Sequence, residues 1–462
     1  ATHLALAQPG GVDRYETPAV PQAARDKSIG DPRGIVWNAA GTRGYITGMG
    51  SNNLVVVDQT GNRVTLGATT ELREGPTGAV LSTDESRLFV VNRFDGSISV
   101  VDTTSLTEIA NVPYFDPTPS DVKTGRKHLY DTHKNSGLGQ IACGSCHVDG
   151  RMDRLAWDLG DPVGSVKLLS GTGSPPQHNL GAGLMGTGGF SDFHPMKGPM
   201  TTQTLQDIIG KEPFHWRGDR DGLEEFNPAF MGLQGDDAML TALEMQEFED
   251  FLATTHFPPN PFRNIDNTLP TNLPLPGQFA NGRFVLANGA PLPNGNAVNG
   301  LQIYRNQGAP LDAGSSTCVI CHTLPVGDGT DSQFNGSAFV PIAAGPNGEH
   351  HVALVSSDGS TNRTIKIPQL RNQYDKAGFE MTPGHPSLSG FGLLHDGSVD
   401  SIARFVSLPV FLVTSDQDVA NLTALILAFS GGFADAPPNP GPSLEAPGNP
   451  TNNAPAAVGK QV

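Results

Sequence analysis

Residues 143–147 read CGSCH, and residues 318–322 repeat the same Cys-x-x-Cys-His spacing as CVICH. The two stretches contain all four cysteines of the 462-residue chain, and each places a histidine directly after its second cysteine. Two residues between the cysteines allow one short helical turn to present both sulfur atoms to one edge of a planar ligand. The adjacent histidine can then reach the centre of that ligand from one side.

This spacing is typical of covalently attached c-type haem. The two thiols add to the haem vinyl groups, and the histidine becomes the proximal ligand of the iron. The sequence therefore predicts two haem c cofactors, with both motif histidines as metal ligands. The expected cofactor-binding residues are Cys143, Cys146 and His147 for the first haem, and Cys318, Cys321 and His322 for the second.

Three other interpretations of the cysteines remain open. A disulfide framework would not explain a histidine at the same place twice, and a chain of this length does not need such cross-links. A zinc site built from two Cys-x-x-Cys pairs also leaves the histidines unexplained. A thioredoxin-like redox pair would need a βαβ context, which the sequence does not show.

Charge and hydropathy narrow the expected location and partners. No apolar run is long enough to span a membrane, so we expect no transmembrane segment. Haem attachment of this kind occurs outside the cytoplasm, and the start of the chain fits a mature exported protein in the periplasm or at the cell surface. The formal net charge of −17 disfavours nucleic acid and anionic membranes as partners. It favours a neutral or basic electron donor.

Residues 31–58 and 75–102 form two copies of one repeat. Tyr45 matches Phe89 and Asp58 matches Asp102, and each copy alternates β-rich runs with Gly, Asn and Asp turns. A period near 44 residues (Asp58 to Asp102) with several strands per unit is typical of propeller blades, and the copies resemble YVTN-type repeats.

Two blades cannot close a propeller, which needs about four to eight. The copies could form a small sheet docked on the haem domains, or the chain could be part of a longer protein. An additional chain could also complete the β-propeller. An ordinary β-sandwich fragment is the alternative to propeller blades.

A short helix is expected before each Cys-x-x-Cys-His motif and a closing helix after it, at 237–256 and 418–430. Crossing of two such helices is typical of c-type cytochromes. The predicted fold is therefore multidomain, with two mainly-α c-type cytochrome domains preceded by an N-terminal β-repeat region. The expected parts are an extended arm at 1–30, two propeller-like repeats at 31–115, a first haem c domain at 116–257, a Pro/Asn linker at 258–290, a second haem c domain at 291–432 and a Pro/Asn/Ala-rich tail at 433–462.

The sixth ligand of each iron decides between an electron carrier and a site that binds a small molecule. Met381 is the only methionine after Met245, so it is the expected methionine donor for the second haem. The histidine alternatives there are His350, His351, His385 and His395. Spacing cannot choose among the candidates for the first haem, which are His178, His194, His215, Met185, Met196 and Met200.

The chain from about 121 to 430 resembles the bacterial dihaem cytochrome c peroxidase superfamily, which includes the MauG-type enzymes. Five segments match this family in order. They are LYDTHKNSGLGQIACGSCH (129–147), HPMKGPMTTQTL (194–205), PFHWRGDRDGLEEF (213–226), IKIPQLRNQY (365–374) and LLHDGSVDSI (393–402).

The resemblance implies roles for several of these residues. His194 stands where the family has the displaceable distal histidine of the first haem, which makes it a catalytic and metal-binding candidate. Trp216 stands where the family has a tryptophan between the haems, a catalytic candidate as electron relay. His395 has a second-sphere position near the second haem. A calcium ion between the haem domains would also fit the family.

Some positions depart from the family pattern. Lys-Gly-Pro follows His194 with one fewer intervening residue than expected. The family's Met or Tyr ligand follows the His-Asp-Gly segment, where this chain has neither, and Met381 precedes that segment. The acidic catalytic residue has four candidates, which we interpret as solvated surface: Glu224, Glu225, Asp236 and Asp237. His215 has no assigned role.

Two functions follow from these observations. The first is a peroxidase-like oxidoreductase that takes electrons at the second haem from a small cytochrome c or cupredoxin. It reduces hydrogen peroxide, or oxidises a substrate, at the first haem. The second is a non-catalytic dihaem electron-transfer protein whose β-repeats bind a partner. The resemblance favours the enzyme.

Overall fold

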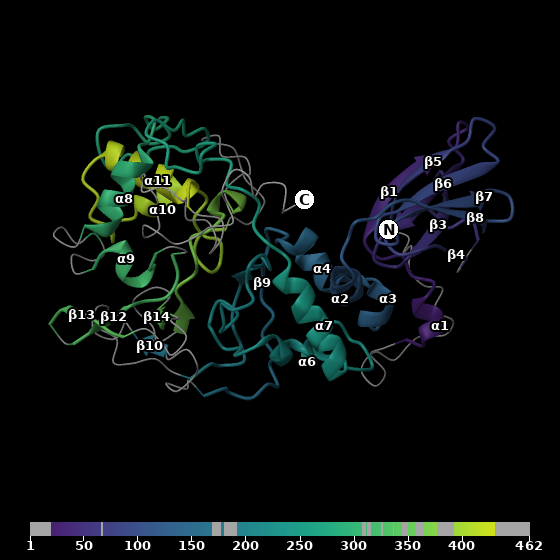
Figure 1. Cartoon of the computed structure of the whole chain (residues 1–462), viewed down its shortest axis with the longest axis horizontal. Helices are drawn as coiled ribbons and strands as arrows, with labels where there is room; N and C mark the ends of the chain where they lie inside the picture. The colour runs from purple at the N-terminus through teal and green to yellow at the C-terminus, as the bar shows by residue number, and fades with distance from the viewer. Residues whose placement is uncertain are drawn as a thin grey trace. The chain divides into compact units, whose positions relative to one another are not determined.

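The computed structural model describes residues 20–65, 68–168, 192–306, 311, 316–324, 327–335, 337–343, 350–356, 364–376 and 392–429, with the backbone alone at 177–179, 333–334, 353–356 and 364. The chain forms two compact units (Figure 1). The first unit contains residues 1–153 and 223–255, and the second contains 154–222 and 256–462. The domain boundaries expected from the sequence remain predictions.

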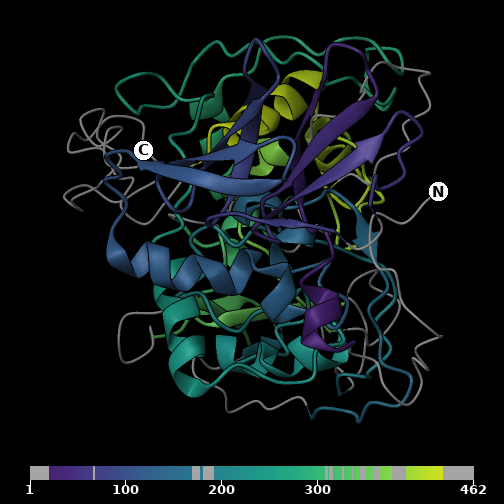
Figure 2. The same ribbon diagram turned by 90° about the vertical axis from the view of Figure 1, so that its right-hand side faces the viewer.

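Each repeat of the first unit folds into one four-stranded antiparallel sheet, visible in purple and blue in Figure 2. Both sheets are simple meanders in which each strand pairs with the next. Short Gly/Asn/Asp turns connect the strands, except for the longer connection at 59–69 between β3 and β4. The strands are β1 (Pro32–Trp37), β2 (Arg43–Gly48), β3 (Asn53–Asp58) and β4 (Thr70–Glu71) in the first sheet, and β5 (Pro76–Leu81), β6 (Arg87–Asn92), β7 (Ser97–Asp102) and β8 (Thr107–Pro113) in the second.

The two sheets stack face to face. Side chains alternate between the faces of a strand, so one face of the first sheet presents Val36, Tyr45 and Val56 to the second. The second sheet meets them with a face that includes Leu88 and Val90, both fully buried. On the far face of the first sheet, Ile29 packs against Val55 and Val57.

A helix pair supports the CGSCH motif in the first unit. α2 (Ser120–Tyr130) packs against α7 (Ala242–Ala253) (Figure 1). The two helices approach closely at Gly125. A Cβ atom at Gly125 would lie only 2.1 Å from the Glu247 carbonyl oxygen, so only glycine fits this crossing. The structure also describes in this unit α1 (Gln22–Arg25), α3 (Thr132–Asn135), α4 (Cys143–Cys146), α6 (Pro228–Gly232) and the 3-10 helices η1 (Val148–Gly150) and η2 (Leu223–Phe226).

The second unit contains an equivalent pair around CVICH. α8 (Ala297–Arg305) packs against α11 (Asp416–Leu427), and a Cβ at Gly300 would lie 2.2 Å from the Asn421 carbonyl oxygen. From Val419 to Leu427 every residue of α11 is buried. The expected helices before and after each motif are therefore present. Among the described residues of this unit, the other helices are α9 (Cys318–Cys321), α10 (Ile402–Val406) and the 3-10 helix η3 (Gln373–Asp375).

Short strands occur within the loop-rich parts of the second unit and pair with one another. They are β9 (Ala156–Trp157), β10 (Gln177–Asn179), β11 (Met200–Thr201), β12 (Ser332–Phe334), β13 (Phe339–Pro341), β14 (Val352–Ser356) and β15 (Thr364–Lys366). β11 pairs with β9, β12 with β13 and β14 with β15, all antiparallel, whereas β10 pairs with β14 in parallel.

The expectation of two mainly-α cytochrome domains is wrong. Helix accounts for 24% of the structure and strand for 21%, and nearly all strand pairs are antiparallel. The reason is the length of glycine- and proline-rich chain between the helices, because these residues disfavour helix interiors and favour turns. That chain instead forms loops and the short strands β9–β15. No helix within the described ranges is long and apolar enough to cross a membrane.

Candidate functional site

The CGSCH motif forms the single-turn helix α4, followed by a break in the backbone. His147 leaves the helical conformation with φ −88° and ψ 62°, while its N–H still donates to the Cys143 carbonyl at 2.9 Å. Cys143 and Cys146 have free thiols on this turn. Burial raises the pKa of the Cys143 thiol to about 11, and the Gln234 side-chain amide donates to its sulfur at 3.3 Å.

The CVICH motif has the same local conformation in α9. His322 leaves the helix with φ −116° and ψ 71°, and its N–H donates to the Cys318 carbonyl at 2.9 Å. Two motifs 175 positions apart in sequence (Cys143 to Cys318) therefore share one backbone arrangement, as attachment of the same planar group at both would require.

The His322 ring is oriented as a metal-ligating imidazole would be. Its Nδ1 lies 2.7 Å from the Gly327 carbonyl oxygen, which can only accept, so Nδ1 donates. Nε2 then has the lone pair that a metal needs, and such a bond to the other ring nitrogen is common among metal-binding histidines. Burial lowers the pKa of His322, which favours the neutral ring. The residues present therefore fit a haem at this motif.

The turn after His322 is fixed by its neighbours. Gly327 has φ +75°, and a Cβ there would lie 2.8 Å from Leu370 Cβ and 2.9 Å from Phe429 Cε1. The buried Tyr304 hydroxyl donates to the His322 carbonyl. Backbone conformation and packing together place the carbonyl that orients the histidine ring.

The four later family-like segments interlock around Trp216 in the second unit. The Trp216 indole N–H donates to the Thr201 carbonyl at 2.7 Å, and the Thr201 N–H donates to the His395 carbonyl at 2.7 Å. Lys366 N–H donates to the Trp216 carbonyl at 2.8 Å. Segments 194–205, 213–226, 365–374 and 393–402 therefore meet at one buried indole. The structure places Trp216 and His395 in one hydrogen-bonded group.

A lysine ammonium lies over the Trp216 ring. Lys376 Nζ is 4.9 Å from the ring centroid, within the range of a cation–π interaction. Burial lowers the pKa of Lys376 to about 8. The charge beside the indole therefore changes in mildly alkaline solution.

His194 lies in the second unit, whereas CGSCH lies in the first. Its side chain is exposed, and its Nδ1 accepts from the Met196 N–H at 3.1 Å. Arg217 donates to the His194 carbonyl, which ties the histidine loop to the segment that contains Trp216. Ligation of the first haem by His194 remains a prediction.

His215, to which the sequence assigned no role, is held by a buried carboxylate. Its Nδ1 lies 2.8 Å from Asp219 Oδ1, and His215 has the left-handed φ of 68°. Burial would raise the Asp219 pKa. The hydrogen bond from His215 and the nearby charges of His215, Lys197 and Arg217 instead hold it well below its usual range. The Asp-Arg-Asp run after Trp216 was the available sequence clue.

The acidic candidates divide into two kinds. Glu224 and Glu225 are exposed on η2, as expected for solvated carboxylates. Asp236 and Asp237 instead bind Arg25, with N–O distances of 2.6 and 2.5 Å, and Asp236 is buried. The solvated interpretation is therefore wrong for Asp236, because its carboxylate neutralises a buried guanidinium.

The remaining ligand candidates fall into three groups. Met381, His385 and Met185 lie outside the described residues, and His178 is described by its backbone alone, in β10. His350 Nδ1 contacts Asp331 at 2.6 Å, and His351 Nε2 donates to the Ala343 carbonyl at 2.7 Å. Met196 is exposed and Met200 lies in β11. Over the described ranges, no three His, Cys, Asp or Glu side chains are grouped to hold a metal ion.

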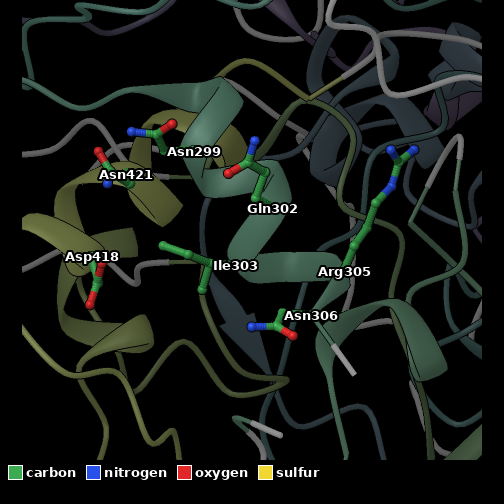
Figure 3. Close-up of a pocket in the computed structure, with 7 residues that line it drawn as sticks. All are labelled: Asn299, Gln302, Ile303, Arg305, Asn306, Asp418 and Asn421. Atoms are coloured by element: carbon green, nitrogen blue, oxygen red, sulfur yellow. The ribbon is translucent and has the colours of Figure 1, made fainter. Parts of the chain in front are cut away.

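A polar pocket lies between α8 and α11, away from the predicted site residues in sequence (Figure 3). Its lining is mostly amide side chains, and Asn421 Oδ1 already accepts from the Asn296 N–H at 2.9 Å. This bond secures the start of α8, which is a structural role. The lining residues are Asn299, Gln302, Ile303, Arg305, Asn306, Asp418 and Asn421.

Comparison with known proteins gives weak similarities. No protein-family model matches the chain, and no curated protein matches it. A structure of Kuenenia stuttgartiensis hydrazine synthase matches at 16% identity over 68% of this chain and 88% of that chain, with a TM-score of 0.37. Another structure of that enzyme matches at 24% identity over 19% and 24%, with a TM-score of 0.18.

A periplasmic gluconolactonase of Pseudomonas aeruginosa matches at 25% identity over 19% of this chain and 28% of that chain, with a TM-score of 0.17. The chain spans about a quarter to a third of the first structures it matches. TM-scores this low establish neither a shared fold nor a shared activity.

Proposed function

We propose that the protein is a dihaem c-type cytochrome that acts as a peroxidase-like oxidoreductase. The observation that supports this most is the local structure of the two motifs. Each is one helical turn with a histidine directly after it, and His322 has its Nδ1 hydrogen-bonded to the Gly327 carbonyl, which leaves the lone pair of the neutral ring on Nε2.

The residues of the chain then have distinct tasks. Cys143, Cys146, Cys318 and Cys321 would attach the two groups, and His147 and His322 would bind the irons. A bound haem would supply electron exchange and an iron that could bind a small molecule. His194 would be the second protein ligand of the first group, and Met381 that of the second.

Trp216 would support electron transfer between the two centres. Its indole N–H is bonded to the Thr201 carbonyl, which fixes the ring, and only 5% of its surface is exposed. A buried and fixed aromatic ring needs little reorganisation of its surroundings when it gains or loses an electron. The electron donor, a small cytochrome c or cupredoxin, and the calcium ion implied by the resemblance remain part of the proposal, as does an exported location.

The alternative is a non-catalytic dihaem electron carrier. One observation favours it: none of the four acidic candidates is a buried, unpaired carboxyl group. Two are exposed and two bind Arg25. A peroxidase needs a group that moves a proton between the peroxide oxygens. His215, which directly precedes Trp216 in the sequence and is held by Asp219, is a candidate for this proton transfer.

The experiment adds one electron per protein and mixes the half-reduced form with hydrogen peroxide in a stopped-flow spectrometer. The enzyme proposal predicts rapid and saturable peroxide consumption. A protein that ignores peroxide except for slow bleaching would be the electron carrier instead.

Trp216→Phe should slow the reaction at least about tenfold, which corresponds to about 1.4 kcal/mol in the barrier. The control Trp157→Phe alters a half-exposed tryptophan of the same unit. If peroxide is consumed but both variants behave alike, the relay role of Trp216 is wrong and the enzyme assignment stands.

A further inference from the structure

The repeat places equivalent residues on the same face of each N-terminal sheet. Val80, Phe89, Ile98 and Val100 of the second sheet match Val36, Tyr45, Leu54 and Val56 of the first, and Val91 matches Thr47. Cross-strand pairing puts Val80, Phe89 and Val100 on one face, with Val91 and Ile98 beside them. We call these five residues the outer face of the second sheet.

The matching residues of the first sheet form the contact between the two sheets. Tyr45, Leu54 and Val56 are 3%, 1% and 7% exposed because they pack on the second sheet. Thr47 adds a hydrogen bond from its hydroxyl to the Thr77 carbonyl at 2.7 Å. In the first sheet, the residues at these positions are therefore buried by contact with the neighbouring sheet.

The outer face of the second sheet has the same apolar pattern but is covered less than its match in the first sheet. Val80 is 58% and Val91 39% exposed, Phe89 and Ile98 are half-buried, and Val100 is 8% exposed. Val112, paired with Ile98, is 53% exposed. Val91 also replaces the hydrogen-bonding Thr47, which makes this face more apolar than the buried one. Exposed apolar side chains that are contiguous on a sheet indicate an interaction surface.

A glycine gives a second, independent indication. Gly34 is required in the first sheet, because a Cβ there would lie 2.3 Å from the Thr77 carbonyl oxygen of the second sheet. Its match, Gly78, has nothing within 4 Å of a Cβ position in the structure. A strand glycine with free space around it costs stability without local benefit, unless another backbone approaches there.

We infer that the outer face of the second sheet docks a further four-stranded antiparallel sheet of the same repeat type, one that lies outside residues 1–462. The contact would continue the stacking already present between the first two sheets. The docked sheet would present a face like the one that the second sheet turns to Tyr45, which includes Leu88, Val90 and Val101. This goes beyond the proposed redox function and does not depend on it.

A second copy of the chain fits this face less well. The face that includes Leu88 and Val90 is already buried against the first sheet. On the far face of the first sheet, Ile29 covers Val55 and Val57, which are 0% and 2% exposed, whereas Ile35 and Trp37 of β1 are 53% and 41% exposed. Among the described residues, a second copy could therefore offer the β1 part of that face or its own outer face, and neither reproduces the face that includes Leu88 and Val90.

The test uses the full chain, expressed from its own gene in the organism that encodes it. A photo-crosslinking amino acid replaces Val80, and in a control strain it replaces Val163, which is 92% exposed in the second unit. Mass spectrometry identifies the cross-linked peptide. We expect the Val80 probe to link to a peptide outside residues 1–462 that has the alternating strand pattern and Gly/Asn/Asp turns of the repeat.

A glycine variant tests the geometry of the contact without disturbing the fold. Gly78→Gln should lower the cross-linking yield about tenfold or more, because the side chain would occupy the space of the approaching sheet. Its control, Gly232→Gln, alters another glycine with nothing within 4 Å and should leave the yield unchanged. Thermal unfolding of both variants checks that the fold is intact. A link within residues 1–462, to a second copy, to a protein without the repeat pattern, or no yield above the Val163 control would each overturn the proposal.

Discussion

At the scale of single residues, the orientation of His322 depends on one glycine. The Gly327 carbonyl accepts from His322 Nδ1, and Gly327 combines φ +75° with contacts that leave no room for a Cβ. A sequence alone can place the histidine next to the cysteines. It cannot show which carbonyl, five residues later, fixes the histidine ring.

Gly327→Ala should therefore lower the free energy of unfolding of the second unit by about 1–3 kcal/mol, from backbone strain and steric overlap. It should also shift the reduction potential of one haem, since the histidine loses its aligned acceptor. The control Gly210→Ala has a similar φ of +81° but nothing within 4 Å. Equal effects of the two variants, in equilibrium denaturation and potentiometry, would show that the contacts around Gly327 are unimportant.

Lys376 gives a pH dependence with a definite sign. Burial lowers its pKa to about 8, from 10.5 in the unfolded chain. Between these values the unfolded state binds more protons than the folded state, so this group makes stability rise with pH from about 8 to 10.5. Below pH 8 the buried charge is fully destabilising.

Lys376→Met should thus raise the free energy of unfolding at pH 7 by about 2 kcal/mol, and the gain should vanish near pH 10.5. The parent and the variant must be compared at each pH, because other buried lysines, such as Lys211, also make the stability of both proteins rise over this pH range. Urea unfolding at several pH values measures the difference. The exposed Lys27→Met serves as control. A variant that is less stable than the parent at pH 7 would mean that the contact with Trp216 outweighs burial.

At the scale of elements, the periodic segments were predictable and the short ones were not. Helical spacing of apolar residues located α7 and α11, and the two copies of the repeat cover β1–β3 and β5–β7, whereas β4 and β8 lie outside them. Strands β9–β15 have two to five residues within glycine- and proline-rich chain, too few for a periodic pattern. The site has the same limit: the motif residues follow from sequence, whereas the His215–Asp219 pair and the Lys376–Trp216 contact depend on loops that only the fold brings together.

The two helix crossings offer a matched test. Gly125→Ala and Gly300→Ala would place a methyl group 2.1 and 2.2 Å from a carbonyl oxygen of the facing helix, so each should cost about 1–3 kcal/mol of stability. Gly232→Ala, in α6 with open space, should be neutral or slightly stabilising. Thermal denaturation compares the three. Crossings that tolerate alanine as well as position 232 does would show that the helix pairs are loosely packed.

At the scale of the whole molecule, the presence of the Cys-x-x-Cys-His motifs does not determine the fold of the chain around them. The Cys-x-x-Cys-His motifs led to the expectation of mainly-α domains, but the helices around them are few and the chain between them forms loops and small antiparallel sheets. A motif of five residues requires one helical turn and a few well-placed contacts. It does not determine the composition of the rest of a 462-residue chain.

The central claim is that each motif attaches one haem, and the mass of the denatured, intact protein tests it most directly. Protein produced with a c-type haem maturation system should have the 48.5 kDa polypeptide mass plus that of two haems. Cys318→Ala combined with Cys321→Ala should remove one haem, and Cys143→Ala combined with Cys146→Ala should remove the other. A parent protein with the polypeptide mass alone would contradict the account.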